Sequence, residues 1–363
     1  LAEADAPVTL EIEQWSPRIL DDQAVVPFEP GEGTGVVVDL GTTTLVAQAV
    51  DLETGRILRV ATALNPQARY GADLMTRLHA ESMEPGVQTR LVRATVGELV
   101  SRVAGARDVR DAVLVGNTVM HHLFAGLSVA PLCAVPFRSP TLGLQQCSAR
   151  ELGWATPVAS RVSVLPCIGG FVGSDVLAGI VAVGLDEADT PGALLDLGTN
   201  GEIAVGCRAG IRCASTAAGP AFEGGRIGLG MRAGTGAIDR VVVRDGALAC
   251  EVIGSGPARG VCGSGVVDAV ACARELGWVL PNGRLSTGRR EIPLVGDVRI
   301  VQADVRELQL AKGAVAAGLQ LLGGEREIAP ARVFLAGAFG NYVQEASARR
   351  IGLLPPWVIG TTP

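Results

Sequence analysis

Two apolar runs along the chain end in the same four residues, Asp-Leu-Gly-Thr. The first run, residues 36–38, leads into Asp39 and Gly41, after which a second apolar stretch begins. The same order of apolar and polar positions returns in residues 194–205, around Asp196. β-Branched and aliphatic residues interrupted by a Gly are typical of a strand, a tight turn and a returning strand. We therefore predict two β-hairpins, separated by about one domain length.

The rest of the pattern alternates helices with strands. Apolar positions at helical spacing predict amphipathic helices, and short apolar runs bounded by Gly predict strands. The predicted helices cover residues 74–83, 87–104, 119–124, 176–183, 266–275 and 304–322, and further strands cover 112–115 and 333–336. Together with the repeated hairpin, this predicts an α/β protein with two lobes, 34–190 and 191–363. Residues 1–33 are expected to be a linker or the tail of a preceding domain.

The turn of the first hairpin is rich in hydrogen-bond donors. Gly41 allows a tight turn whose N–H groups face one side, together with the hydroxyls of Thr42, Thr43 and Thr44. Such a concave set of donors suits phosphate oxygens. Asp39 stands where a metal ion on those phosphates needs a carboxylate. Many ordinary hairpins carry a similar turn, so the second copy is what gives the prediction its weight.

The second hairpin offers the same chemistry. Asp196 is followed by Gly198, Thr199, Asn200 and Gly201. Two lobes with one such hairpin each can face each other across a cleft and hold one nucleotide polyphosphate with Mg²⁺ from both sides. The reaction would be phosphoryl transfer to water, in which positioning and charge neutralisation do most of the catalysis.

A third stretch, which follows the two hairpins in the sequence, is a predicted strand that ends in a Gly-rich turn. The predicted strand 333–336 ends in a turn that contains Gly337, Ala338 and Gly340. The lack of bulky side chains lets a flat ring approach the backbone there. The three stretches in this order resemble the superfamily of acetate and sugar kinases, seventy-kilodalton heat-shock chaperones and actin. The resemblance implies a two-lobed actin-like ATPase fold, with duplicated ribonuclease-H-like lobes around a nucleotide cleft and the adenosine on the third turn.

Other polar residues lie in Gly-rich segments. Asp175 follows three glycines and precedes a helix, where it either orients a water or hydroxyl nucleophile or acts as the helix N-cap. Glu223 lies on a predicted short helix after a Gly-Pro break and is a candidate nucleotide contact. The string around Asn117 either presents backbone donors at a helix N-terminus or simply caps that helix. Lys312 is a further candidate for contact with a nucleotide.

Composition narrows the classes of function. The chain has 363 residues, of which 48% are hydrophobic, and its mean hydropathy is +0.35. This is ample for two cores of ordinary domain size. The net charge of −6 offers no basic footprint for nucleic acid. No apolar run reaches membrane-spanning length, and no secretory signal is visible. We therefore expect a cytoplasmic protein with neither nucleic acid nor membrane as a partner.

The eight cysteines are scattered, and no Cys-x-x-Cys pair occurs. Zinc ribbons and plant-type ferredoxins need clustered thiolates, so neither is encoded here. Disulfides are rare in cytoplasmic proteins, and we interpret these cysteines as small buried thiols. His121 and His122 have no carboxylate or thiol at ligand spacing, so a metal ion is not expected there.

Longer strings narrow the resemblance to one family. Over about residues 34–363 the chain resembles the C-terminal ATPase domain of the reductive activators of corrinoid proteins. The matching strings are residues 63–67, 71–73, 116–123, 166–173, 218–225 and 263–265. Members of this family couple ATP hydrolysis to the reduction of an inactive Co(II) corrinoid protein to Co(I). Their electron enters through an N-terminal ferredoxin domain with a 2Fe-2S cluster.

The resemblance implies roles for the matching residues. ATP and Mg²⁺ would be held by the two hairpins, with Asp39 and Asp196 as metal-binding and catalytic carboxylates. The partners would be a corrinoid protein and an electron-donating ferredoxin domain, and a homodimer is one assembly that the resemblance allows. The chain departs from the family in having no ferredoxin cysteines. The 2Fe-2S cluster is therefore expected only on a domain that is missing from this chain.

Three alternatives stay open at this point. A small-molecule kinase of the same fold would need a carboxylate base beside a substrate hydroxyl, for which Asp175 is the candidate. A nucleotide-dependent chaperone or regulator would turn ATP over slowly without a small-molecule acceptor. An activator of 2-hydroxyacyl-CoA dehydratases would share an iron–sulfur cluster across a dimer. Cys262 lies in a similar motif, but only Cys272 follows it.

Overall fold

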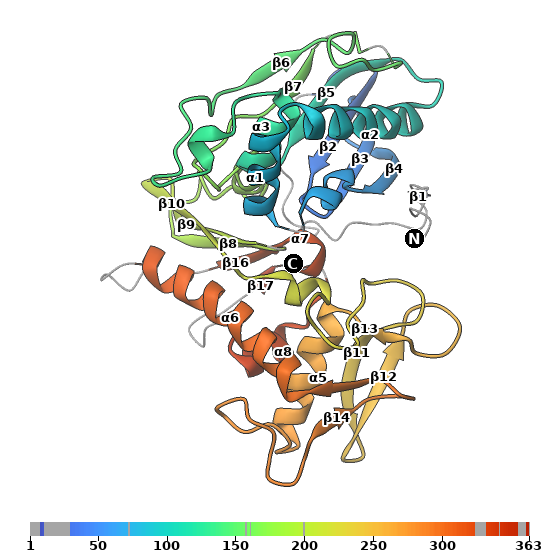
Figure 1. Ribbon diagram of the computed structural model, residues 1–363, viewed down its shortest axis with the longest axis vertical. Coiled ribbons are helices and arrows are strands. Elements are labelled where there is room, and N and C mark those ends of the chain that lie inside the picture. The colour runs from blue at the N-terminus through green and yellow to red at the C-terminus, as the bar shows by residue number, and fades with distance from the viewer. Residues whose placement is uncertain are drawn as a thin grey trace. The chain divides into compact units, whose positions relative to one another are not determined.

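The protein consists of two compact units in the computed structural model, and each unit is described by itself (Figure 1). Unit 1 contains the described residues up to Ala182, and unit 2 contains those from Val183 onward. The division falls before the predicted lobe boundary at residue 190. The structure describes residues 8–10, 30–71, 73–156, 158–159, 161–198, 200–323, 332–340, 342–354 and 361–362.

Unit 1 is built on a mixed sheet of seven strands. They are β1 (Val8–Leu10), β2 (Thr34–Leu40), β3 (Thr44–Asp51), β4 (Ile57–Leu64), β5 (Val109–Val115), β6 (Gln145–Cys147) and β7 (Val162–Val164). The hairpin β2–β3 and strand β4 form an antiparallel meander, and β5 and β7 continue the sheet parallel to β2. β1 comes from the segment that was expected to be a linker or the tail of a preceding domain, and it pairs with β4 at one edge.

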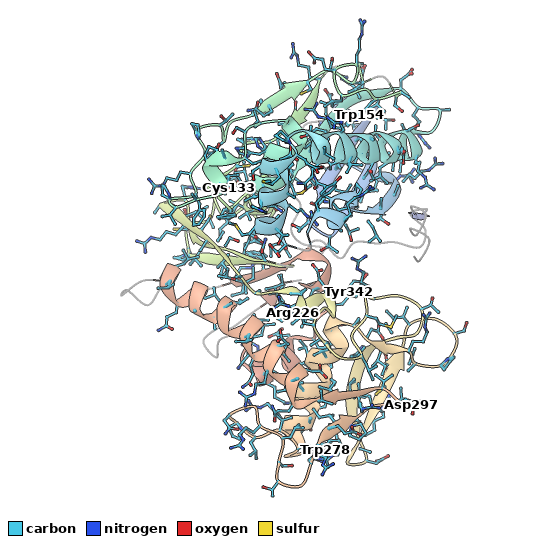
Figure 2. The ribbon with its side chains drawn as sticks, viewed as in Figure 1. Cys133, Trp154, Arg226, Trp278, Asp297 and Tyr342 are labelled. Carbon is cyan, nitrogen blue, oxygen red and sulfur yellow. The ribbon has the colours of Figure 1, made fainter. Side chains whose placement is uncertain are left out.

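Helices pack on this sheet as the apolar spacing predicts. The helical segments are η2 (Pro66–Tyr70), α1 (Leu74–Met83), α2 (Val87–Ala104), α3 (Thr118–Ala125), η3 (Ala130–Leu132) and α4 (Ser174–Ala182). α2 contacts β3 and β4 through a fully buried apolar face that includes Val92, Val96 and Val103. Trp154 lies beside α2 (Figure 2), where its Nε1 donates to the Arg93 carbonyl at 2.9 Å. The predicted helices 74–83 and 87–104 are thus confirmed.

The main sheet of unit 2 repeats the strand order of unit 1. It contains β8 (Gly192–Leu197), β9 (Gly201–Cys207), β10 (Gly210–Thr216), β16 (Arg332–Ala336) and β17 (Thr361–Thr362). β10, β9 and β8 form an antiparallel meander, and β16 and β17 follow parallel to β8. The strands β4, β3, β2, β5 and β7 of unit 1 have the same order and the same directions. The predicted duplication of ribonuclease-H-like lobes is therefore present.

The rest of unit 2 packs around a second, smaller sheet and a set of helices. These elements are η4 (Pro220–Glu223), β11 (Ala237–Arg244), β12 (Ala247–Val252), β13 (Gly260–Val261), α5 (Gly263–Glu275), β14 (Glu291–Pro293), β15 (Arg299–Val301), α6 (Gln302–Gly323), α7 (Gly337–Gly340) and α8 (Glu345–Ile351). The long helix α6 covers β9 and β10, while α5 packs on β11 and α8. Buried Leu308, Val315 and Leu319 of α6 join the same apolar core as Leu195 of β8.

Among the helices of the described residues, none is both long enough and apolar enough to cross a bilayer.

Candidate functional site

The first predicted hairpin forms a tight turn at the end of β2. The β2–β3 ladder continues to the pair Leu40 and Leu45, so residues 41–44 make the connection. A Cβ on residue 41 would collide with the carbonyl oxygen of Thr44. Only Gly fits at this position, because the chain reverses direction too closely for any side chain. The sequence of the turn thus follows directly from its geometry.

Two buried asparagines from other elements hold this turn. Asn65, which caps η2 after β4, donates from Nδ2 to the Gly41 carbonyl at 2.9 Å and from its backbone N–H to the Thr43 carbonyl at 3.0 Å. Asn117, which caps α3 after β5, donates from Nδ2 to Thr42 Oγ1 at 3.0 Å. The turn is therefore fixed from the ends of the neighbouring segments of unit 1.

The carboxyl ends of parallel strands bring further candidates to the same edge of the unit 1 sheet. Asp39 is exposed near the end of β2 and is paired in register with Val115 of β5. The start of α4 lies against the end of β5, because the Ser174 N–H donates to the Gly116 carbonyl at 2.9 Å. In open α/β sheets this edge is where ligands bind. The structure thus collects Asp39, the Thr42 turn and the first turn of α4 at one edge.

Asp175 is the second residue of α4, so it lies inside the first turn and does not occupy the position that precedes the helix. Its Oδ1 accepts a hydrogen bond from the Val176 N–H at 2.8 Å. The interpretation as N-cap residue is therefore corrected by two positions, because α4 begins at Ser174, although the carboxylate does bond to the helix N-terminus. A carboxylate here is also favoured by the positive end of the helix dipole. The catalytic role of Asp175 stays a prediction.

The histidines near this edge are buried, and the Cys167 thiol is half-buried. His122 places Nδ1 2.8 Å from the Thr118 carbonyl and Nε2 2.7 Å from Ser139 Oγ. Burial lowers the pKa of both histidines, and that of His121 falls to about 4. Burial raises the pKa of the Cys167 thiol to about 11, with a smaller contribution from the negative charge of Asp175. At neutral pH these groups are therefore uncharged.

The second hairpin lies between β8 and β9 in unit 2. The Gly198 N–H donates to the Asn200 carbonyl at 3.1 Å across the turn, while Thr199 lies outside the described residues. Gly201 starts β9 and packs closely against Thr216, whose Oγ1 donates to the Gly201 carbonyl at 3.0 Å. Asp196 is half-buried at the end of β8, and burial raises its pKa to about 6. It is still mostly ionised at neutral pH.

The predicted adenosine turn lies directly beside Asp196. β16 pairs with β8 so that Ala336 is opposite Asp196, and α7 begins at the next residue, Gly337. Gly337 has a φ of +83°, and a Cβ there would lie 2.5 Å from Asp196 Oδ1. Glycine is required for both reasons. Ala338 and Gly340 complete the short helix α7, so the third predicted stretch and the second hairpin form one cluster.

An aromatic stack connects Glu223 to this cluster. The ring of Phe339 in α7 stacks on that of Phe222 in η4, with centroids 4.7 Å apart and planes inclined by 19°. Glu223 is the next residue along η4 and is half-buried. Glu223 therefore lies on η4, the element that packs against the predicted adenosine turn in α7. Its role as a nucleotide contact stays a prediction.

Other candidates have structural partners. Lys312 Nζ donates to the Ile351 carbonyl at the end of α8, at 2.6 Å, which accounts for its position. Cys262 Sγ lies 3.3 Å from Ser264 Oγ, and Cys272 Sγ donates to the Val241 carbonyl at 3.3 Å. Among the described residues, no group of three or more His, Cys, Asp or Glu side chains could hold a metal ion.

Two further residues of the site region, Asn65 and Glu202, were not predicted from the sequence. Asn65 follows β4, and only its position next to Pro66 distinguishes it as a helix cap. Glu202 of β9 is buried, is paired in register with Asp196 and accepts a hydrogen bond from Ser215 at 3.1 Å. The alternation of side chains along β9 could have placed Glu202 on the same face as Asp196.

Comparison with known proteins identifies both units. The protein-family model of the RACo middle region matches residues 34–188. The family model of the C-terminal domain of RACo, the ASKHA domain, matches residues 191–361. The solved structure of a reductive activator for corrinoid, iron-sulfur protein superposes with a TM-score of 0.80 and 29% identity. It covers 92% of this chain, which in turn covers 59% of that chain.

Curated relatives agree with this match. The corrinoid activation enzyme RamQ of Eubacterium limosum is 34% identical over 362 residues, which cover 88% of this chain and 60% of the relative. The Co(II) methylated amine-specific corrinoid protein reductase of Methanosarcina barkeri is 28% identical over 363 residues, which cover 88% of this chain and 66% of that relative. This chain therefore spans about three fifths to two thirds of the length of these relatives. Because two consecutive regions of one family match nearly the whole chain, the protein belongs to the family of reductive activators of corrinoid proteins.

Proposed function

We propose that this chain binds ATP with Mg²⁺ at its hairpins, hydrolyses the ATP and thereby drives the reductive activation of a corrinoid protein. The observation that carries the proposal is the duplication. In two sheets of the same strand order, the corresponding strands β2 and β8 each end in Asp-Leu and are followed by Gly. Membership of the corrinoid activator family favours this function over the kinase, chaperone and dehydratase-activator alternatives.

The residues present fit a magnesium nucleotide. Proteins usually hold Mg²⁺ by one or two carboxylates together with phosphate oxygens and water. Asp39 and Asp196 would supply these carboxylates, one from each hairpin. Gly337 has no side chain and its backbone lies against Asp196, so that a larger residue there would crowd the carboxylate that would hold the metal. When bound, Mg²⁺ neutralises phosphate charge that develops during transfer to water.

The chain's own residues would position the nucleotide. Thr42, Thr43 and Thr44 would contact phosphate oxygens on the first hairpin, and Gly198, Thr199 and Asn200 would do so on the second. Glu223 and the turn from Gly337 would contact the adenosine side. Asp175, at the N-terminus of α4, would orient the attacking water. That both hairpins hold one nucleotide stays a prediction.

Reduction of a corrinoid would need an electron carrier from elsewhere. The described residues offer no cluster of metal-binding side chains, and the pKa values of Cys167 and Cys272 are raised to about 11, mainly by burial. An iron–sulfur cluster needs several thiolates close together, which separated cysteines do not supply. We therefore propose two partners, a corrinoid protein and an electron-donating ferredoxin domain with a 2Fe-2S cluster. The cytoplasm is the compartment that suits such a reaction.

The test combines calorimetric titration of Mg-ATP with a phosphate-release assay. Wild-type protein should bind Mg-ATP and hydrolyse it slowly. The substitution Asp196→Asn should reduce turnover roughly 100-fold or more, because it removes a charge that acts on the transition state. Asp297→Asn, an exposed carboxylate between β14 and β15 (Figure 2), is the matched control and should leave turnover unchanged. Wild-type turnover in Asp196→Asn would exclude the proposed role of this carboxylate.

A further inference from the structure

The side chain of Asn117 makes two hydrogen bonds that together determine its orientation. Its Oδ1 accepts from the Met120 N–H at 3.0 Å, in the first turn of α3. An amide oxygen can accept from an N–H, whereas an amide nitrogen cannot. The other end of the amide must therefore be the nitrogen, and it lies 3.0 Å from Thr42 Oγ1. Both residues are buried, with 4% of Asn117 and 8% of Thr42 exposed.

This contact decides what the Thr42 hydroxyl can do. A hydroxyl has one hydrogen to donate and two lone pairs that accept. Because Asn117 uses one lone pair, the hydrogen of Thr42 must point elsewhere. In the part of the chain that the structure describes, no protein acceptor is found for it. The hydroxyl is thus held as a donor, which is the polarity that an anion requires.

Asn65 holds two backbone carbonyl oxygens of the same turn in hydrogen bonds, so that they do not act as free acceptors. It donates to the Gly41 carbonyl and to the Thr43 carbonyl, on either side of Thr42. These two carbonyl oxygens would otherwise repel a phosphate group. Their hydrogen bonds to Asn65 turn them toward the protein. The turn therefore directs acceptors inward while the Thr42 hydroxyl remains a donor.

We infer that Asn117 is a positioning residue, which orients the Thr42 hydroxyl to donate to a phosphate oxygen of the nucleotide on the first hairpin. The inference rests on the proposed nucleotide site and adds a polarity-determining residue to it. Asn117 itself need not touch the nucleotide. Its effect on phosphate affinity passes through Thr42, and this makes the effect separable from its role as helix cap.

The test is a double-substitution cycle on the whole chain. Asn117→Ser keeps a capping oxygen for Met120 but removes the amide donor, and it adds no charge. Thr42→Val removes the hydroxyl. Each should weaken ADP and Mg-ATP binding roughly 10- to 100-fold, as expected for a hydrogen bond to a charged group. The double variant should be no weaker than Thr42→Val, since both changes remove the same bond.

Two controls separate positioning from stability. Adenosine lacks phosphates, so its affinity should be the same in wild type and Asn117→Ser. Asp73→Ser changes the N-cap of α1, which accepts from the Thr76 N–H at 2.9 Å, and should leave ADP affinity unchanged. Thr42→Ser should restore most of the affinity that Thr42→Val loses.

The outcomes distinguish this inference from the proposed function. If wild-type protein binds neither ADP nor Mg-ATP, both are wrong. If wild-type protein binds them and Asn117→Ser binds them equally well, only the inference is wrong. Additive losses in the double variant, or an equal loss of adenosine affinity, would also overturn it, because Asn117 would then act through the fold and not through Thr42.

Discussion

Single polar side chains connect distant parts of unit 1. Asn65 and Asn117 each use the amide oxygen as a helix cap and the amide nitrogen to hold the first hairpin. Replacing either one would leave buried groups without partners, which typically costs about 1 to 3 kcal/mol per group. The same chemistry thus stabilises the local helix and shapes the turn.

His121 is a buried residue with a different consequence, because its imidazole ring is fully shielded from solvent. Burial and the neighbouring His122 lower its pKa from 6.5 to about 4. Below pH 6.5, His121 therefore binds a proton in the unfolded chain but stays neutral in the folded chain until the pH approaches 4. The free energy of unfolding should fall as the pH drops from 6.5 toward 4, by at most about 3 kcal/mol from this group.

Denaturant unfolding at pH 7.5 and pH 5.0 would measure this effect. His121→Leu removes the titrating group and should reduce the loss of stability between the two pH values. His79 is exposed on α1, and His79→Gln should leave the pH dependence as in wild type. If His121→Leu loses as much stability as wild type on acidification, the assignment to His121 is wrong.

At the scale of elements, glycine fixes how a strand passes into a turn. Gly41 and Gly337 follow β2 and β16, and both positions lack room for a Cβ. In each case the atom that a Cβ would meet belongs to the predicted site: the Thr44 carbonyl beside the first turn and the Asp196 carboxylate beside the third. Glycine is therefore required at both positions, because the backbone packs directly against another part of the chain beside the predicted site.

A pair of Gly→Ala substitutions in unit 2 should have opposite effects. Gly337→Ala combines a φ of +83° with a clash against Asp196, so it should destabilise the protein by about 1 to 3 kcal/mol and weaken nucleotide binding. Gly313 lies within α6 with open space around its Cβ position, so Gly313→Ala should stabilise by up to about 1 kcal/mol.

Thermal or denaturant unfolding, together with ATP titration, would check both variants. Gly313→Ala should bind ATP as wild type does, which makes it the control for Gly337→Ala. Unchanged ATP affinity in Gly337→Ala would show that the third turn does not hold the adenosine.

At the scale of the whole molecule, the two units repeat one topology but differ in their additions. Unit 1 extends its sheet with β1 and β6 at the edges. In unit 2 the chain forms a separate sheet of β11, β12 and β13 after β10, before it returns to the main sheet at β16. The shared strands carry the two hairpins, so the common part of the units is also the part that the proposed function needs.

We expect the whole chain to hydrolyse ATP but not to reduce a corrinoid protein by itself. Its cysteines are unclustered, and an electron carrier would have to be supplied. Purified chain should be colourless and free of iron. The assay would mix the chain, Mg-ATP, a chemical reductant and a candidate Co(II) corrinoid protein, and follow the cobalt absorbance with and without a ferredoxin domain. ATP-dependent formation of Co(I) without that domain would contradict the proposed electron path.

The sequence by itself determined the features that depend on neighbouring residues. Helices α1 and α2 follow from apolar residues at helical spacing, and both hairpins follow from apolar runs interrupted by Gly. The repetition of the hairpin also indicated two α/β lobes, and short strings sufficed to indicate the family. Each of these signals lies within one helix or one hairpin, where periodicity alone sets which side chains face the core.

Only the tertiary structure decided which distant residues meet. Asn65 and Asn117 reach the first turn from 24 and 75 residues away, because β4 and β5 end beside it. Gly337 lies against Asp196 because β16 pairs with β8, and no local pattern contains that pairing. For Asp175, an acidic residue near a helix start fits either a cap or a ligand contact, and only the first turn of α4 showed that it is not the capping residue. Strand order in a sheet is set by the packing of the entire core, so contacts across it follow from the fold and not from the residues on either side.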